Sequence, residues 1–182
     1  MKRSLIYLLV FFGMLTSCNW IDSDINVDPD SPADPSLYLV LPSVQGFTAY
    51  NTHSFDIAGT TGMWLQQIQG AARQAAAIYN YEFKEGDIAN AWNGFYADAM
   101  KDANIIMTKA AEINNPHYEA VGKILMAYNL GLATQLFGDI PYSEAFQGTD
   151  NLNPAYDSQQ QIYAAIFTLL DDAIAKLQQP YG

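Results

Sequence analysis

The sequence contains one cysteine and two histidines, and these shortages exclude several classes of protein. A single cysteine, Cys18, excludes a framework of intrachain disulfides. His53 and His117 are too few for a histidine-rich metal site and are interpreted as surface or helix-end residues, so neither a metal nor a cofactor is expected. After residue 18, no apolar run is long enough to predict a transmembrane helix.

Basic residues are also scarce. The chain has 8 Lys and Arg against 19 Asp and Glu, a formal net charge of −11. Because a nucleic-acid binder needs a basic face to neutralise phosphates, no nucleic-acid partner is expected. Half of the 182 residues are hydrophobic and 13% are aromatic, which excludes a disordered acidic tail and suits a packed domain.

Residues 1–17 have the organisation of a lipoprotein signal peptide. Lys2 and Arg3 precede an apolar run over residues 5–15, which is shorter than the ~20 residues of a spanning helix but typical of a secretory signal. Leu15-Thr16-Ser17-Cys18 then resembles a bacterial lipobox, in which small residues precede the cysteine that receives the lipid. We expect a lipid anchor at Cys18; an ordinary signal with a chance cysteine is the alternative.

Residues 18–36 predict an acidic, proline-rich tether behind the lipidated cysteine. The segment contains five aspartates and three prolines but neither lysine nor arginine. Proline disfavours helix and like charges extend a chain, so this stretch is interpreted as a stalk between membrane and domain. The spaced aspartates allow a calcium loop as the alternative, although the glycine and distal glutamate of an EF-hand are missing.

Residues 37–182 predict an all-α domain, because helical periodicity is present and strand alternation is not. We expect the first part to form a short helix, a second helix and an irregular segment, over residues 37–47, 57–73 and 74–86. Pro42 is expected to disturb the first helix. Trp64 and Trp92 lie on helical apolar stripes, which assigns both side chains to the core.

Three longer helices are expected further along the chain, over residues 87–113, 117–137 and 158–178. The second begins after Pro116, ends before Gly138 and is apolar on most sides, which predicts burial between neighbours. The third follows Asp157 as its expected N-cap, with Gln160 at the capping-box position. Long helices with short connections predict an array of helical hairpins.

A specific string, FGDIPYSEA, follows the second of these helices at residues 137–145. It resembles a phrase found in the SusD/RagB family of Bacteroidetes outer-membrane lipoproteins, particularly in the second SusD-like branch. Residues 26–30, Asn-Val-Asp-Pro-Asp, resemble the family's opening after the lipidated cysteine. Trp92 with Tyr96 and the stretch 156–171 also match, so the resemblance covers the whole chain after Cys18.

This resemblance implies a fold built on tetratricopeptide (TPR)-like helical hairpins and a role in nutrient capture. Family members sit at the cell surface as lids over a SusC-like TonB-dependent transporter, to which they deliver glycans or sometimes peptides. The resemblance therefore implies an oligosaccharide or peptide ligand, a SusC-like partner and outer-membrane attachment through Cys18. Members are more than twice this long, so residues 37–182 are interpreted as the N-terminal part of a truncated SusD-like domain. A helical protein–protein adaptor without a small-molecule ligand is the alternative.

Candidate site residues are few, and no catalytic residue is expected. Tyr79, Tyr81 and Phe83 are candidates for a sugar-stacking platform, because aromatic faces are apolar and a ring hydroxyl offers a hydrogen bond; ordinary packing is the alternative. Asp139 and Glu144 would be the minimum pair for acid–base work on a glycosidic bond, but we interpret them as turn residues. Phosphate loops and nucleophile elbows are absent, which favours a binding protein over an enzyme.

Overall fold

The structure, a computed structural model, describes residues 34–180. The predicted signal peptide, the lipobox and the predicted tether before Asp34 lie outside these residues, and so do residues 181–182. The chain divides into two units, residues 1–35 and 36–182, and the helices described below belong to the second. Within the described residues, we find no helix that is long and apolar enough to cross a membrane.

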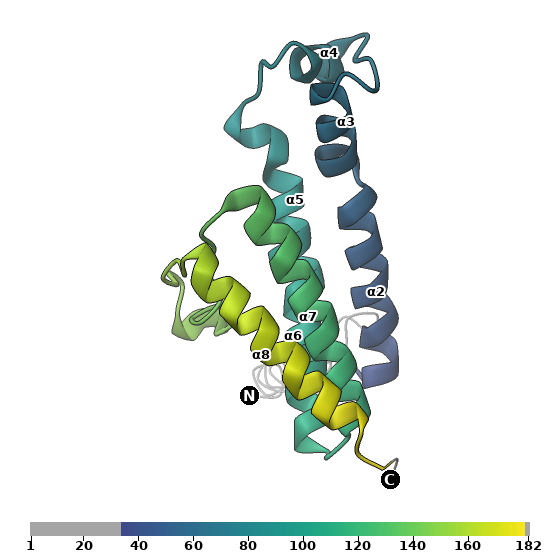
Figure 1. Ribbon diagram of the computed structural model, residues 1–182, viewed down its shortest axis with the longest axis vertical. Coiled ribbons are helices and arrows are strands. Elements are labelled where there is room, and N and C mark those ends of the chain that lie inside the picture. The colour runs from purple at the N-terminus through teal and green to yellow at the C-terminus, as the bar shows by residue number, and fades with distance from the viewer. Residues whose placement is uncertain (1–33, 181–182) are drawn as a thin grey trace, which may run out of the picture. The chain divides into compact units, whose positions relative to one another are not determined.

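The second unit is built from helices (Figure 1); most of their connections are short, but a longer one over residues 138–158 precedes the last helix. In chain order they are α2 Leu37–His53, η2 Phe55–Gly59, α3 Thr60–Trp64, α4 Arg73–Tyr79, η3 Glu85–Ile88, α5 Ala89–Asn93, η4 Gly94–Met100, α6 Lys101–Glu112, α7 Pro116–Phe137, η5 Gly148–Asp150 and α8 Gln159–Leu177. Of the short elements, η2 and η4 are π-helical, and η3 and η5 are 3₁₀-helical. Over residues 34–180 there is no strand, only an isolated bridge between Ile140 and Asp157, which confirms the all-α fold.

The helix α2 continues through Pro42 to His53, so its predicted end at residue 47 is wrong. Pro42 is exposed, and the backbone there lacks the N–H that would continue the helical hydrogen bonds. The inner side buries Val40 and Val44, and α2 packs against η4, α6 and α7. This packing supports the helix across the proline, because tertiary contacts contribute more to helix stability than local propensity does.

The helix predicted over residues 57–73 forms only in part. It ends at Trp64, and Gln66 then adopts a positive φ of 56°, which turns the chain. The carbonyl of Gly62 accepts backbone hydrogen bonds from Gln67 and Ile68, at 2.9 and 3.3 Å. The segment predicted to be irregular contains a helix instead: the chain folds back, and α4 packs against α3.

From Glu85 to Glu112, η3, α5, η4 and α6 follow one another without a break, which confirms the helix predicted over 87–113. Its middle is π-helical and lies close to α2: a Cβ added to Gly94 would be 2.2 Å from Oδ1 of Asn51. Glycine permits this approach because it has no side chain to separate the two helices. Ile113, the C-cap residue, follows the last turn of α6 and is exposed.

The last two long helices match their predicted ranges to within one residue. His53 ends α2 and His117 lies in the first turn of α7, as expected. The cap of α8 differs from the prediction. Ser158 is the N-cap and Gln161 is its capping-box partner, with the backbone N–H of Ser158 donating to Gln161 Oε1 at 2.8 Å. The assignment of Asp157 and Gln160 to these positions is therefore wrong.

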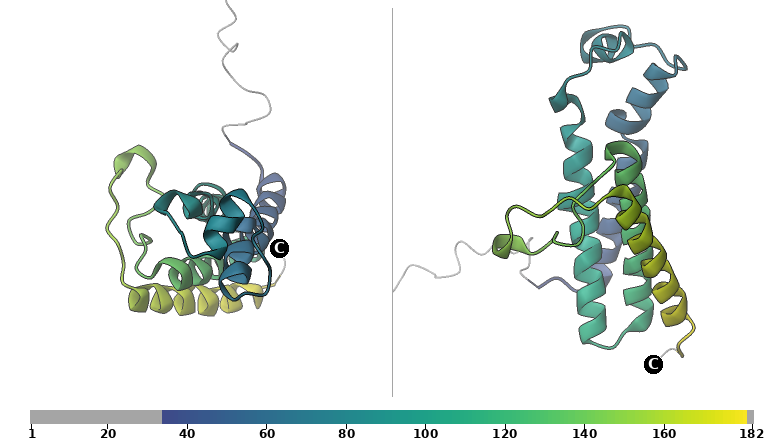
Figure 2. Two further views of the ribbon diagram at one scale, coloured as in Figure 1. Left: turned by 90° about the horizontal axis from the view of Figure 1, so that it is seen from above. Right: turned by 60° about the vertical axis from the view of Figure 1, so that its left-hand side comes forward.

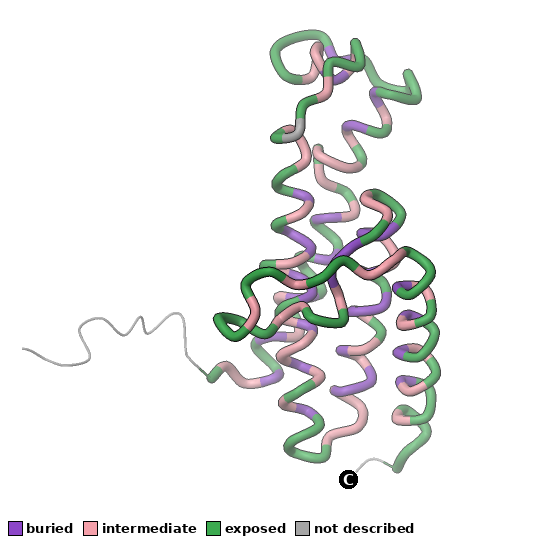
Figure 3. Tube along the Cα trace, turned by 90° about the vertical axis from the view of Figure 1, so that its left-hand side faces the viewer, coloured by how far each residue is buried: buried purple, intermediate pink, exposed green. Residues whose placement is uncertain are grey.

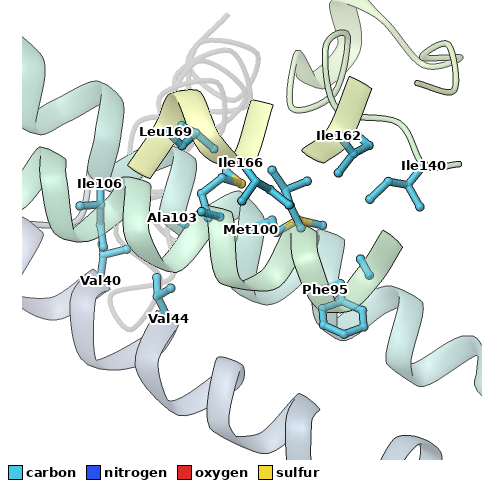
Figure 4. Packing of buried hydrophobic residues seen from close by; sticks show 14 of the residues in the cluster. Val40, Val44, Phe95, Met100, Ala103, Ile106, Ile140, Ile162, Ile166 and Leu169 are labelled. Atoms are coloured by element: carbon cyan, nitrogen blue, oxygen red, sulfur yellow. The ribbon is translucent and has the colours of Figure 1, made fainter. Parts of the chain in front are cut away.

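The core lies where α2, η4, α6, α7 and α8 meet. α7 packs against α6 and α8 and also contacts α2 (Figure 2). Figure 4 shows side chains from these helices converging, and the core includes Val40, Val44, Phe95, Met100, Ala103, Ile106, Met126, Leu130, Ile162, Ile166 and Leu169. Trp92 is partly buried against this cluster, as predicted.

The outer faces of the helices remain open, as the alternation of buried and exposed positions in Figure 3 shows. The expected burial of α7 on most sides is wrong for one face, since Ile124 and Tyr128 are exposed.

Inside the bundle, Nδ2 of Asn129 on α7 donates a hydrogen bond of 2.8 Å to the hydroxyl of Thr48 on α2. This bond joins two buried polar side chains and gives Nδ2 of Asn129 and the Thr48 hydroxyl a partner where water cannot reach.

Candidate functional site

An exposed aromatic cluster forms at the α3–α4 tip, where the chain turns back on itself. The ring of Trp64 lies 6.5 Å from that of Tyr81 in a stacked arrangement, and 5.1 Å from that of Phe83, edge to face. Tyr81 is 61% exposed and Trp64 is 38% exposed. We call these three residues the tip cluster. The structure therefore brings together two of the three predicted platform residues and adds Trp64 to them.

Hydrogen bonds hold the tip cluster in place. The indole N–H of Trp64 donates to the carbonyl of Ile78 at 3.1 Å, and the hydroxyl of Tyr81 donates to the carbonyl of Trp64 at 2.9 Å. Tyr81 has a positive φ of 62°, in the left-handed region that residues other than glycine rarely adopt. Each of these two polar groups is thus paired with a backbone carbonyl, while the ring of Tyr81 stays largely exposed.

Tyr79 does not belong to this cluster. It ends α4 and is half-buried, and its Cβ lies 2.9 Å from where a Cβ on Gly70 would be. Within residues 34–180, no ring contact links Tyr79 to Tyr81 or Phe83. For Tyr79, packing against the returning chain accounts for its position.

The assignment of Trp64 to the core is wrong. The apolar stripe that suggested it depends on a helix continuing to residue 73, whereas the helix ends at Trp64 itself. Without the next turn of helix, the indole lies at the end of α3 and packs on residues that follow α4. Gly59 and Gly62 do not mark this helix end, because both lie within helical segments that form before Trp64.

The string FGDIPYSEA forms the connection from α7 toward α8, and Asp157 holds it. Oδ2 of Asp157 accepts hydrogen bonds from the backbone N–H groups of Tyr142 and Ser143, at 2.8 and 2.7 Å. The backbones of Ile140 and Asp157 exchange two further bonds, at 3.1 and 3.0 Å. Burial alone would raise the pKa of Asp157, but hydrogen bonds from Ser143 and Tyr142 lower it below its usual value. The carboxylate is therefore stabilised in its charged form.

Asp139 and Glu144 also serve structural contacts. Oδ1 of Asp139 accepts the backbone N–H of Gln159 at 2.8 Å, at the start of α8, where an acidic group is favourable. Oε2 of Glu144 accepts the backbone N–H of Ala155 at 3.0 Å and so ties the two ends of the following loop together. These contacts support the interpretation of both residues as turn residues rather than as an acid–base pair.

Across residues 34–180, no group of three or more His, Cys, Asp or Glu side chains could hold a metal ion. A family model described as "Starch-binding associating with outer membrane", that of SusD-like proteins, matches residues 32–181. The chain belongs to the SusD-like family.

A solved structure supports this membership. The crystal structure of a SusD/RagB family protein from Bacteroides thetaiotaomicron matches with a TM-score of 0.71 and 30% sequence identity. The match covers 80% of this chain but 31% of that one, so the SusD-like chain spans about a third of the length of its solved relative. No curated protein sequence matches. The predicted array of TPR-like helical hairpins is confirmed by this fold.

Proposed function

We propose that this SusD-like chain is the N-terminal part of a cell-surface lipoprotein that captures glycans and delivers them to a SusC-like TonB-dependent transporter. The observation that carries the proposal is the family match over residues 32–181, whose description joins starch binding to the outer membrane. The overall fold supports it, because the solved relative of the same family shares the arrangement of helices. Capture without turnover is part of the proposal, since the family consists of binding proteins.

The tip cluster of Trp64, Tyr81 and Phe83 is the proposed glycan contact. A sugar ring has an apolar face of C–H groups, which an exposed aromatic face can cover while the sugar hydroxyls stay in water. The indole N–H and the Tyr81 hydroxyl donate to backbone carbonyls, so the rings are oriented before any ligand arrives. Side chains that are already ordered lose less entropy on binding.

Attachment to the outer membrane is assigned to lipid on Cys18. Removing the signal peptide also removes Lys2 and Arg3, which leaves the rest of the chain still more acidic. An acidic protein is not attracted to anionic lipid headgroups, so charge cannot supply the anchor. Acyl chains on Cys18 would supply it through burial of their methylene groups.

The test is binding by the full-length mature protein, measured by calorimetry against maltoheptaose and a panel of other oligosaccharides and peptides. Tyr81→Ala is expected to weaken binding of the tightest glycan by about tenfold, which is roughly 1.4 kcal/mol. Tyr50→Ala is the matched control, since Tyr50 is similarly exposed on α2. Unchanged affinity in Tyr81→Ala would remove the tip cluster from the proposal.

The partner is tested by co-purification of the lipidated protein from outer membranes. Recovery of a TonB-dependent barrel with the wild-type protein is the expected result. Recovery of the barrel by a protein that binds none of the panel would favour the adaptor alternative. Turnover of any panel member would contradict capture without catalysis.

A further inference from the structure

Apart from the tip cluster, aromatic residues also line a hollow between η4 and the loop that follows FGDIPYSEA. It has a volume of about 550 Å³, and its walls include Trp92, Tyr96, Pro141, Phe146 and Tyr156. A volume of this size is within the range of pockets that hold small ligands. The tip cluster is built by different elements, α3 and the residues after α4.

Three aromatic rings that line this hollow contact one another in a row: Trp92, Tyr96 and Phe146. Trp92 and Tyr96 lie 4.5 Å apart with their planes tilted by 31°, and Tyr96 stacks on Phe146 at 6.1 Å with an angle of 24°. Their positions along one helix and one loop create a run of ring surface. Such a surface suits a ligand with flat apolar faces.

Hydrogen bonds within the protein hold the walls of the hollow in place. The hydroxyl of Tyr96 donates to the carbonyl of Pro141 at 2.8 Å, and burial raises the pKa of Tyr96, so this proton stays in place. Glu144 accepts hydrogen bonds from Ala155 N–H and from Nδ2 of Asn151, at 3.0 and 3.3 Å. The hollow is thus a built feature, whose loop is tied at both ends.

One wall is open to solvent at Tyr156, which is 65% exposed. A neighbouring hollow of about 430 Å³ shares Trp92 and Tyr156 with the first. Tyr156 therefore lines both hollows. A chain-like ligand longer than one ring could extend from one hollow into the other.

Charge decides the class of ligand. None of the residues that line either hollow is charged, although the chain as a whole carries 19 acidic and 8 basic residues. Polar groups are supplied by the amides of Asn153 and Asn93 and by the hydroxyl of Tyr156. An anionic ligand would find no cation here, whereas an uncharged ring with hydroxyl edges would find apolar faces and amide partners.

We propose that this hollow is a second saccharide site, specific for neutral sugars, with Tyr156 as its exposed stacking residue. The proposal rests on the proposed function, because it assigns a further contact for the captured glycan. It predicts that glycan affinity depends on two aromatic clusters on separate elements, and that acidic sugars do not use this one.

The experiment measures calorimetric binding of maltoheptaose, xylohexaose, mannohexaose and hexagalacturonate to the full-length mature protein. The variants are Tyr156→Ala, Tyr156→Phe, Tyr81→Ala and the matched control Tyr38→Ala, which changes a tyrosine of similar exposure, 67%, on α2. Tyr156→Ala is expected to weaken the tightest neutral ligand about tenfold, roughly 1.4 kcal/mol. Tyr156→Phe keeps the ring and is expected to retain most of the affinity, while Tyr38→Ala is expected to change nothing.

The outcomes separate the two proposals. If Tyr81→Ala weakens binding and Tyr156→Ala does not, the second site is overturned and the proposed function stands. If only Tyr156→Ala weakens binding, the second site stands and the tip cluster is overturned as the contact. If Tyr156→Ala weakens the binding of hexagalacturonate as much as that of the neutral ligands, the restriction to neutral sugars is overturned. If Tyr38→Ala also weakens binding, the assignment to this hollow is overturned. Absence of binding to all four probes overturns the second site.

Discussion

Asp157 and Ser143 are joined by two short hydrogen bonds: the backbone N–H of Ser143 donates to Oδ2 at 2.7 Å, and its hydroxyl donates to Oδ1 at 2.7 Å. Both oxygens of one carboxylate thus hold the turn that begins the loop beside the aromatic hollow. The sequence pattern suggested a helix cap for Asp157, whereas its side chain organises the most specific string of the chain.

Replacing this carboxylate should loosen the connection between α7 and α8. Asp157→Ala leaves the N–H groups of Tyr142 and Ser143 without their charged acceptor, and we expect it to lower the free energy of unfolding by about 2 kcal/mol. Urea unfolding measures the change. Asp171→Ala, at an exposed position of α8, is the control and should change stability by less than about 0.5 kcal/mol. Equal effects would mean that the turn does not depend on Asp157.

A charge network joins α7 to α8 and gives a second prediction. Oε1 of Glu119 pairs with Lys123 at 2.7 Å and Oε2 pairs with Lys176 at 2.9 Å, while Lys123 also bonds Asp172. Glu119→Gln leaves two partly buried ammonium groups without their shared partner, so we expect a loss of roughly 1–3 kcal/mol in unfolding free energy. Glu112→Gln, at an exposed position, is the control.

A double-mutant cycle tests whether this loss comes from the network. Combining Glu119→Gln with Lys176→Met should cost less than the sum of the single changes, because the two residues share one interaction. Strict additivity would show that Glu119 and Lys176 contribute independently.

The same carboxylates predict a loss of stability in acid. Burial acts to raise the pKa of Glu119, but hydrogen bonds from Lys123 and Lys176 lower it overall, and the pKa of Asp157 is also lowered. Because folded values lie below the unfolded ones, about 4, this stability is fully present above pH ~4 and is lost as the pH falls through the folded values. Melting temperature against pH measures this. In Glu119→Gln the acid decline should be shallower, and an identical profile would contradict the assignment.

The contact between Gly94 and Asn51 predicts a steric effect. A Cβ at residue 94 would lie 2.2 Å from Oδ1 of Asn51, so Gly94→Ala should separate η4 from α2 and cost roughly 1–3 kcal/mol in unfolding free energy. Gly46→Ala, where nothing lies within 4 Å, is the control and should stabilise α2 by roughly 0.5–1 kcal/mol. Asn51→Ala should relieve part of the cost of Gly94→Ala, and no relief would show that another contact is limiting.

Lipidation of Cys18 is a further prediction, made from the sequence alone. Cys18→Ala should abolish incorporation of a palmitate analogue and release the protein from the membrane fraction, because the acyl chains would be its anchor. Labelling of living cells followed by fractionation checks both readouts. Ser17→Ala keeps a small residue before the cysteine and should still be labelled. Undiminished labelling of Cys18→Ala would refute the lipobox interpretation.

Much of the fold could be predicted because the long helices carry strong periodic patterns. Phe95, Ala99, Ala103 and Ile106 recur at three- and four-residue steps, and each is buried. Pro116 and Gly138 bracket α7 as local stereochemistry requires. The failures fall where a long-range contact overrides a local signal, as at Pro42, where packing of α2 outweighs the proline.

The candidate site was less predictable, because its residues come from separate elements. Tyr81 and Phe83 could be proposed from their spacing, but Trp64 joins them only because the chain reverses after α3. The hollow beside η4 was not predicted: Trp92 was assigned to the core, Tyr96 was noted only for the family resemblance, and Phe146 lies 50 positions after Tyr96.

The sequence by itself determined the helical class, the ranges of the long helices and the family resemblance, since these depend on periodicity and on short strings that act locally. Only the tertiary structure decided which aromatic residues meet, where α3 ends, and that Asp157 holds a turn rather than caps a helix. The physical reason is that a ring contact or a hydrogen bond depends on the distance between atoms in space. Residues far apart along the chain acquire that distance only when the helices have packed.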